Sequence, residues 1–280
     1  MHDAAISPAV PAPSAEPLSE RIERHFVEVI ERTPVTAEPF DHMVLEGLWP
    51  VRDYPALLRA LPADAYYREL KHNDALLPDG RSARLQFPLL AANIKRLPAG
   101  PRELWMEVGR AVTSPRVMEA WKRRFAPTLE RVTGRPASRI RLRPYATLFR
   151  DLGGYKISIH PDSMRKAITA QFYLPADDSQ AHLGTIFHTR HADGSYAVAR
   201  TMRFGPNTGY AFAVSPTSYH SVNPMRVEDK PRNSLMVIIN HDRGPLVEGV
   251  KSTQKKVRAW MDRLRGVDAV EAGEGRYETM

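Results

Sequence analysis

Three short stretches of this sequence carry side chains of the types that bind metal ions and carboxylates in proteins. "YKISIHPD" ends with His160 and Asp162, "SYHSV" supplies His220, and "KPRNSL" supplies Arg232 and Ser234. Two imidazoles and one carboxylate can ligate a divalent transition metal on one face and leave its remaining positions open. A guanidinium with a neighbouring hydroxyl is suited to a carboxylate, because its planar fork donates two parallel hydrogen bonds.

The His-x-Asp pattern occurs three times, and its context separates the three copies. Residues 72–74 lie in the polar stretch "KHNDALLPDG" and residues 191–193 lie at a turn, so we expect both to be solvated. Only residues 160–162 end an alternating, strand-like segment. If the extended backbone continues through the intervening proline, both side chains share one face, since side chains alternate along a strand. The alternative is a hydrogen-bonded pair that closes the strand and binds no metal.

Two other residues are alternatives for the remaining roles. His241, in "IINHDRG", is the alternative to His220 as third ligand, although it follows Arg232 in the chain. Arg226 is the alternative carboxylate partner, but it lies in a polar connection, whereas Arg232 opens a strand-like segment. We therefore favour Arg232, whereas His220 is favoured over His241 by the order of residues in a family that this sequence resembles.

The order His-x-Asp, then His, then Arg-x-Ser resembles the Fe(II)/2-oxoglutarate-dependent oxygenases. "GYKISIHPDSMRKAITAQFYLP" is similar to their prolyl-hydroxylase-like branch. The resemblance implies that His160, Asp162 and His220 bind Fe(II). It also implies that Arg232, helped by Ser234, holds the distal carboxylate of 2-oxoglutarate. That branch often has lysine at the position of Arg232, which leaves the subgroup open.

The resemblance covers roughly residues 140–242 and implies a reaction as well as a site. The cofactor would be Fe(II), with 2-oxoglutarate and O2 as cosubstrates. Oxidative decarboxylation would release succinate and CO2 and hydroxylate an aliphatic carbon. Because the carboxylate ligand Asp162 is present, we expect hydroxylation and not halogenation. The metal-bound oxidant would perform the chemistry, so no separate catalytic acid or base is expected.

The elements that would position these residues change in character along the chain. Apolar residues at helical spacing predict a helical part over 18–135, with Ser19 and Asp53 as N-caps and a helix break at Pro127. From 140 to 242 the segments are short and alternating, which predicts a double-stranded β-helix, or jelly roll, with flanking helices. Asp193-Gly194 predicts a hairpin turn. The expected strands lie near 140–150, 155–160, 167–174, 184–190, 196–203, 209–214, 218–222 and 233–240.

The organisation that follows is one oxygenase domain over 18–266. Within it we expect the helical part, the jelly-roll core over 140–242 and a C-terminal helix over 250–265. Residues 1–17 are rich in Ala and Pro and predict a disordered tail, and 267–280 predict a flexible one.

Further contacts depend on which strand faces line the barrel. Tyr145 and Gln171 sit on faces that, if turned inward, would contact 2-oxoglutarate. Arg165, Tyr155 and Arg143 are the candidate substrate contacts, with Arg165 suited to a substrate carboxylate. The alternative for each is an outward, solvated position.

The composition of the chain limits the classes of site and binding partner that it can have. The chain has 280 residues, a net charge of +8 and no cysteine, which excludes disulfides, thiolate metal sites and a cysteine nucleophile. No run of about 18 apolar residues predicts a membrane span. The N-terminus lacks the pattern of a secretory leader, so we expect a cytoplasmic protein. No nucleic-acid-binding signature accompanies the arginines. The sequence does not decide between a monomer and a homodimer.

The expected substrate is a small anionic molecule. The layout of the chain resembles bacterial hydroxylases of free or N-substituted amino acids, which makes the β-carbon of a free or N-succinyl branched-chain amino acid the best hypothesis. Two alternatives remain. One is an oxygenase that acts on a protein side chain, and the other is a non-catalytic basic jelly-roll domain that binds nucleic acid or another anion.

Overall fold

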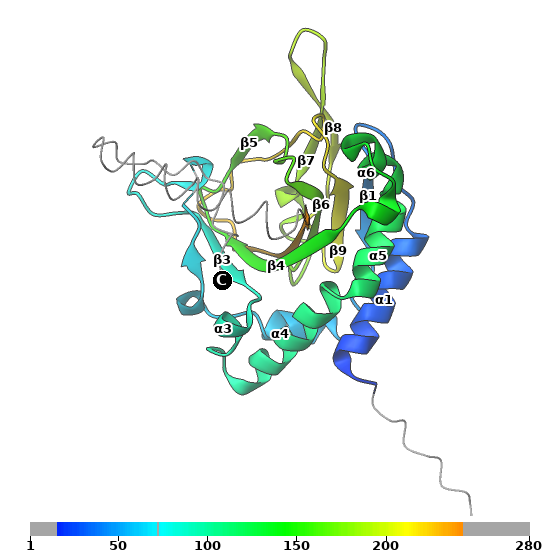
Figure 1. Ribbon diagram of the computed structural model, residues 1–280. Coiled ribbons are helices and arrows are strands. Elements are labelled where there is room, and N and C mark those ends of the chain that lie inside the picture. The colour runs from blue at the N-terminus through cyan, green and yellow to red at the C-terminus, as the bar shows by residue number, and fades with distance from the viewer. Residues whose placement is uncertain (1–15, 72, 243–280) are drawn as a thin grey trace, which may run out of the picture.

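Two antiparallel sheets form the body of the computed structural model, which describes residues 16–71 and 73–242 (Figure 1). The larger sheet has the order β1 (His42–Glu46), β9 (Thr208–Ala213), β6 (Lys166–Tyr173), β11 (Arg232–His241), β4 (Leu142–Asp151), β3 (Arg84–Pro88), β2 (Arg68–Glu69). The smaller sheet has the order β5 (Ile157–His160), β10 (His220–Val222), β7 (Ile186–Arg190), β8 (Tyr196–Thr201).

The chain passes repeatedly between the two sheets. From β4 to β7 each strand joins the opposite sheet to the one before it, and the same holds from β9 to β11. This strand order is that of a jelly roll. The predicted fold class is therefore confirmed, and the eight strands expected between 140 and 240 all form, with ends within two residues of the expected ones. The β7–β8 hairpin turns at Gly194, whose φ is 87°.

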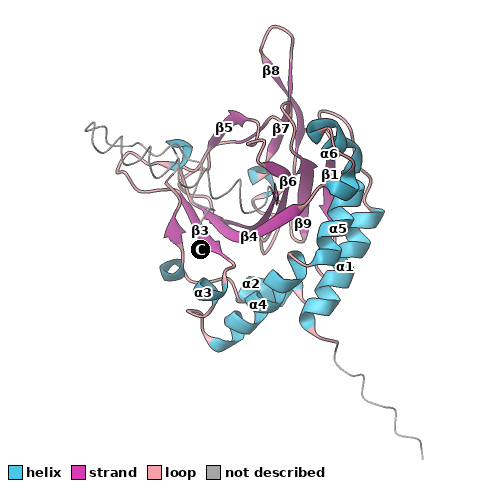
Figure 2. Cartoon of the chain, viewed as in Figure 1, coloured by secondary structure: helices cyan, strands magenta, loops and turns pink. Residues whose placement is uncertain are grey.

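Within residues 16–71 and 73–242, the six α-helices cover one face of the larger sheet (Figure 2). They are α1 (Leu18–Arg32), α2 (Tyr54–Arg59), α3 (Ala91–Ile94), α4 (Ala99–Val112), α5 (Pro115–Arg124) and α6 (Ala126–Thr133). The break expected at Pro127 is present, because α5 ends and α6 begins around Phe125. The C-terminal helix expected over 250–265 and both expected tails, apart from residues 16 and 17, lie outside the described residues.

The region expected to be mainly helical also contributes β1, β2 and β3. These strands pair with segments far along the chain, as His42 does with Phe212. Local alternation of side chains therefore did not predict them. Of the two predicted N-caps, Ser19 is wrong, whereas Asp53 does occupy the N-cap position of α2. Helix α1 begins at Leu18, one residue before Ser19. Asp53 makes no capping bond, because its carboxylate accepts two hydrogen bonds from Arg21, at 2.9 and 2.8 Å.

Alternation along each strand of the larger sheet divides its side chains between two apolar clusters. On β6, Phe172 faces the helices, where its ring lies 5.4 Å from that of Phe26 on α1. Tyr173 faces the other way, into the space between the sheets, and meets Tyr210 at 5.9 Å between ring centroids. Thr169 and Gln171 share this inward face with Tyr173. The interior of the jelly roll is thus partly polar, whereas the helix-covered side is apolar.

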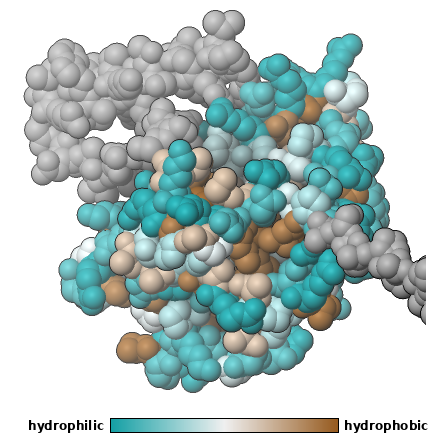
Figure 3. Space-filling model, turned by 90° about the horizontal axis from the view of Figure 1, so that it is seen from below, coloured by the Kyte–Doolittle hydropathy of each residue, from teal (hydrophilic) through white to brown (hydrophobic). Residues whose placement is uncertain are grey.

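The outer surface is mixed. The face seen in Figure 3 is mostly hydrophilic, with apolar residues gathered towards the middle of the view. Apolar atoms cover more than half of the surface of ordinary folded proteins, so this pattern alone marks no site. Across residues 16–71 and 73–242, no helix combines the length and the apolar character that a membrane span requires.

Candidate metal centre

His160, Asp162 and His220 come together at one end of the smaller sheet. His160 is the last residue of β5, His220 is the first of β10, and the two residues are paired across the strands. Their ring centroids lie 4.4 Å apart. One ligand atom from each of the three side chains lies within 4.8 Å of the others, which is a spacing that a single metal ion can bridge.

Backbone carbonyls orient both imidazoles. Nδ1 of His160 lies 2.8 Å from the carbonyl oxygen of Ser158, and Nδ1 of His220 lies 3.0 Å from that of Ser218. A carbonyl can only accept, so each Nδ1 carries a proton, and in a neutral imidazole Nε2 then keeps its lone pair. The partner of one ring nitrogen thereby leaves the other as the metal-ligating atom, as is usual in histidine metal sites.

Asp162 is buried and held from both sides. Its Oδ1 accepts a hydrogen bond from Nζ of Lys166 at 2.5 Å, and its Oδ2 accepts one from Oγ1 of Thr169 at 2.6 Å. Burial alone would raise the pKa of Asp162, but the charge of Lys166 and these two hydrogen bonds hold that pKa well below its usual range. The carboxylate of Asp162 is therefore ionised, and Lys166 stabilises its negative charge.

The protonation states of the cluster fit a divalent metal. Burial lowers the pKa of His220 to about 4, so its imidazole is neutral at physiological pH. A neutral imidazole and an ionised carboxylate are the forms that bind metals. With His160, they form a set of two nitrogens and one carboxylate oxygen, the donor set typical of non-haem Fe(II).

Arg232 begins β11 and points into the interior, where it is 1% exposed. Its Nε donates to the carbonyl of Leu183 at 2.6 Å, its Nη1 to Asp151 at 2.7 Å, and its Nη2 to Thr185 at 3.3 Å. A guanidinium has five N–H groups. Two of them therefore have no hydrogen-bond partner within the part of the chain that the structure describes, and they can donate to a carboxylate that enters the barrel.

A second arginine joins this buried group. Nε of Arg84, on β3, lies 3.3 Å from the free oxygen of Asp151 without hydrogen-bond geometry, and Nη1 of Arg84 donates to the hydroxyl of Tyr155. Arg84 also stacks over Phe149, 4.1 Å from the ring centroid. Asp151 thus lies between two guanidiniums, which gives the interior end of β4 a cationic character suited to an anion.

A hydrogen-bonded chain lines the interior between the larger sheet's central strands. Nε2 of Gln171 donates to Oγ of Ser234 at 2.8 Å, and the hydroxyl of Tyr210 donates to Oε1 of Gln171 at 2.7 Å. Gln171 and Ser234 were predicted to contact 2-oxoglutarate, Gln171 only if its face turned inward, and both lie in the interior, each 2% exposed or less. Tyr145 shares the inward face of β4 with Thr147 and is half-buried.

The three candidate substrate contacts, Tyr155, Arg143 and Arg165, lie in three different settings. Tyr155 is 2% exposed, beside Arg84. Arg143 is exposed and stacks 5.4 Å from the centroid of Tyr145. Arg165 is half-buried in the loop after Asp162, where its carbonyl accepts from the backbone of His241.

Two alternatives gain no support from the geometry. His241 is outside the cluster of ligand atoms, which contains only His160, Asp162 and His220 among the described residues. Arg226 is exposed, with its backbone N–H bonded to Asp229.

One of the other two His-x-Asp copies behaves differently from expectation. The copy at 191–193 lies at the β7–β8 turn, where Asp193 accepts hydrogen bonds from Ser195. Asp74, by contrast, is half-buried and accepts hydrogen bonds from the backbone and side chain of Ser158, at 3.0 and 3.3 Å. Since the carbonyl of Ser158 orients His160, Asp74 supports the metal cluster from a distance.

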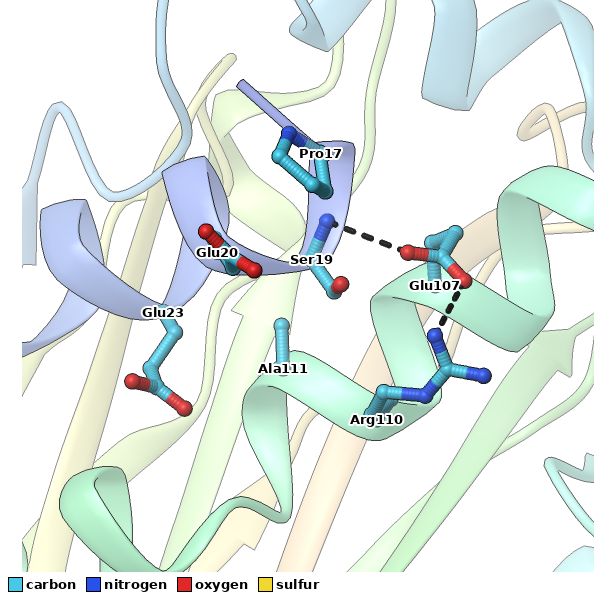
Figure 4. A pocket seen from close by; sticks show the side chains of 7 residues that line it. All are labelled: Pro17, Ser19, Glu20, Glu23, Glu107, Arg110 and Ala111. Carbon is cyan, nitrogen blue, oxygen red and sulfur yellow. Dashed lines mark hydrogen bonds and ion pairs between the residues drawn. The ribbon is translucent and has the colours of Figure 1, made fainter.

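A pocket of about 310 Å³ lies between the first turns of α1 and helix α4 (Figure 4). Glu107 accepts from the backbone N–H of Ser19 at 3.3 Å and from Arg110 at 2.6 Å. The bond from Ser19 ties α1 to α4, whereas the bond from Arg110 lies within α4. None of the residues that line this pocket belongs to the barrel interior, so it is a gap in helix packing and not the functional site.

Sequence reasoning missed Asp151 and Arg84. Asp151 follows the expected end of its strand by one residue, and its role depends on the register that sets it opposite Arg232. The alternation Thr147, Phe149, Asp151 was the available signal, since it continues the inward face. Arg84 lies in a segment expected to be helical, so nothing in the pattern connected it to the barrel.

No family model matches the sequence, and no curated protein matches it. A prolyl-4-hydroxylase from Pseudomonas putida is 13% identical with a TM-score of 0.47, over 81% of this chain and 100% of its own. A Trichoplax adhaerens prolyl hydroxylase, solved with a hypoxia inducible factor peptide, is 11% identical with a TM-score of 0.47, over 80% and 91%.

A third similar structure is the non-heme alpha-ketoglutarate-dependent epimerase SnoN of nogalamycin biosynthesis. It is 15% identical with a TM-score of 0.44, over 79% of this chain and 82% of its own. At these identities and scores, the likenesses carry no weight for function. The fold assignment rests on the strand order of this chain, and the site rests on its own cluster of ligand side chains.

Proposed function

We propose that this protein is an Fe(II)- and 2-oxoglutarate-dependent dioxygenase that hydroxylates an aliphatic carbon of a small substrate. The observation that carries the proposal is the convergence of His160, Asp162 and His220, with Asp162 ionised and His220 neutral, the forms that bind a metal. A jelly roll that only binds a polyanion does not need a buried carboxylate beside two oriented imidazoles.

Fe(II), when bound, would supply the activation of O2 and the oxidation of 2-oxoglutarate to succinate and CO2. The protein's own residues would hold the metal ion and orient its ligands. Ser158 and Ser218 fix the two rings through their carbonyls, and Thr169 fixes the carboxylate ligand. Because three protein ligands occupy one face, the remaining coordination positions stay open to the cosubstrates.

The cosubstrate's distal carboxylate would be held by Arg232, with Ser234, Gln171 and Tyr145 along the same inward face. The two N–H groups of Arg232 that lack partners among the described residues suit a carboxylate. Burial strengthens such a pair, since little water competes for either charge.

For the substrate we propose a free or N-succinyl branched-chain amino acid, hydroxylated at its β-carbon, with Arg165, Tyr155 and Arg143 as candidate contacts. The alternative of a polyanion-binding domain is less well supported. Two cations of the most basic stretch, residues 121–144, are already paired with acids: Lys122 with Glu119 at 2.7 Å and Arg123 with Glu31 at 2.5 Å.

The test is the release of succinate from 2-oxoglutarate by protein reconstituted with Fe(II) under air. Wild type should release succinate even without substrate, slowly, whereas His160→Ala and His220→Ala should release none. His191→Ala, at the β7–β8 turn, is the matched control and should behave as wild type. Absence of succinate from folded, iron-loaded wild type, over a screen of amino acids and their N-succinyl derivatives, would reject the proposal.

A further inference from the structure

A pocket of about 490 Å³ lies beside the metal cluster, and nothing described so far uses it. Its walls come from four separate parts of the chain: the segment before β1, helix α6, the loop after Asp162, and the loop before His220. A volume of this size suits a small molecule.

The pocket and the metal cluster share structure. Met164, which lines the pocket, follows Asp162 by two residues. Ser215 also lines it, and its carbonyl accepts a hydrogen bond from the hydroxyl of Ser218, the residue whose carbonyl orients His220. These short links place the pocket at the end of the barrel where the metal ligands lie.

An aromatic contact makes the same connection through a second route. The ring of Phe40, in the pocket wall, lies 5.5 Å from that of Phe212, and the ring of Phe212 lies 5.0 Å from that of His220. One side chain therefore separates the pocket wall from a metal ligand. The pocket therefore lies on the His220 side of the metal cluster, separated from that ring by Phe40 and Phe212, and its lining does not include Arg232.

The lining combines an apolar surface with one charged pair. Pro39, Phe40, Val132, Met164 and Pro216 supply the apolar part. The charged part consists of Asp41 and Arg131, whose Oδ2 and Nη2 lie 3.3 Å apart.

The two charges are held differently. Asp41 is one-fifth exposed, and its Oδ2 also accepts the hydroxyl of Thr128, which fixes the carboxylate. Its Oδ1 accepts no side-chain hydrogen bond from any described residue. Arg131 is 65% exposed, so its guanidinium can move aside at little cost, because exposed ion pairs contribute little. The pair can open to accept a ligand with charges of both signs.

We propose that this pocket binds the backbone end of a free aliphatic amino acid, with its ammonium group at Asp41 and its carboxylate at Arg131. The apolar side chain then lies over Phe40 and Met164, towards the metal cluster. The inference rests on the proposed function, selects between its two substrate classes, and replaces Arg165, Tyr155 and Arg143 as the contacts of the substrate's charged groups. An N-succinyl substrate has no ammonium group to meet Asp41, and it adds a second carboxylate beside that acidic group.

The experiment measures binding of L-leucine, L-isoleucine and L-valine to the full chain by calorimetry, anaerobically, with and without Fe(II) and 2-oxoglutarate. At least one should bind, and its N-succinyl derivative should bind at least about tenfold more weakly, because one charge-assisted contact is lost. Asp41→Asn and Arg131→Gln should each raise Kd about tenfold or more. Arg123→Gln, which breaks an exposed pair on α5, is the control and should leave Kd unchanged.

The outcomes separate the two proposals. No binding of any free amino acid, tighter binding of the N-succinyl form, or a Kd indifferent to Arg131→Gln would each overturn the pocket assignment. Arg131 is exposed, so its substitution tests the pocket even if Asp41→Asn fails to fold. If wild type binds 2-oxoglutarate and Fe(II) but no amino acid, the oxygenase proposal stands and the pocket assignment falls. Asp41-dependent binding of an amino acid without any 2-oxoglutarate binding would give the reverse result.

Discussion

The hydrogen bond from Thr169 to Asp162 offers a sharp test of how the metal cluster is held. Thr169 is 2% exposed, and its Oγ1 lies 2.6 Å from Oδ2 of Asp162. Thr169→Val keeps the shape of the side chain and removes only the donor. A hydrogen bond to a charged group contributes about 1.5–3 kcal/mol. Loss of a group that orients a metal ligand typically weakens metal affinity about 10–100-fold, or about 1.4–2.8 kcal/mol, which agrees with that range.

The assay is an anaerobic titration with Fe(II), or with Co(II) as a spectroscopic substitute, on Thr169→Val and wild type together. We expect Kd for the metal to rise about 10–100-fold in the variant. The control is Thr147→Val, since Thr147 is equally buried on β4 but donates no hydrogen bond to Asp162. Equal affinities in all three proteins would refute the idea that Thr169 positions the carboxylate ligand.

Three further predictions concern the ion pairs and the buried histidine. Asp151→Asn should lower the free energy of unfolding by about 3–5 kcal/mol, because it leaves buried Arg232 without its partner, while Asp79→Asn, in an exposed pair, should leave urea unfolding unchanged. Arg232→Lys keeps the charge but loses the planar fork, so Kd for 2-oxoglutarate should rise about tenfold or more while Kd for the metal stays the same. Burial lowers the pKa of His220 to about 4, below the value near 6.5 of an unfolded histidine. The unfolded chain therefore binds an extra proton between these two values, and the metal-free protein should lose up to about 3 kcal/mol of stability as pH falls from about 6.5 to 4. In His220→Gln this slope in urea unfolding should flatten, and an unchanged slope would contradict the assignment to His220.

The sequence predicted the jelly-roll strands well because their signal is local. The alternation of apolar and polar side chains predicts each strand from β4 to β11 from its own residues, whichever strand it pairs with. Gly194 likewise predicts a turn, because glycine readily adopts the positive φ that the turn requires. The metal cluster was predictable for a related reason. His160 and Asp162 are neighbours in the chain, and the order of the other residues completed the pattern.

The features that the sequence did not reveal depend on pairing between distant segments. β1 is a strand because it pairs with β9, some 170 residues away. The helical spacing of the apolar residues around β1 led to a helical prediction for this region. The contact of Asp151 with Arg232 requires the exact register of β4 against β11. Likewise, Asp41 and Arg131 form a pocket wall only because α6 packs beside the segment before β1. Local patterns carry no information of this kind.

The most direct test of the central proposal is an anaerobic titration of wild type and His160→Ala with Fe(II) and 2-oxoglutarate. Members of the family that this sequence resembles show a weak visible charge-transfer band when 2-oxoglutarate chelates the bound iron. We predict that band in wild type and none in His160→Ala, with both proteins folded by circular dichroism. A folded wild type without the band, or an equal band in both proteins, would contradict the assignment of His160, Asp162 and His220 as the iron site.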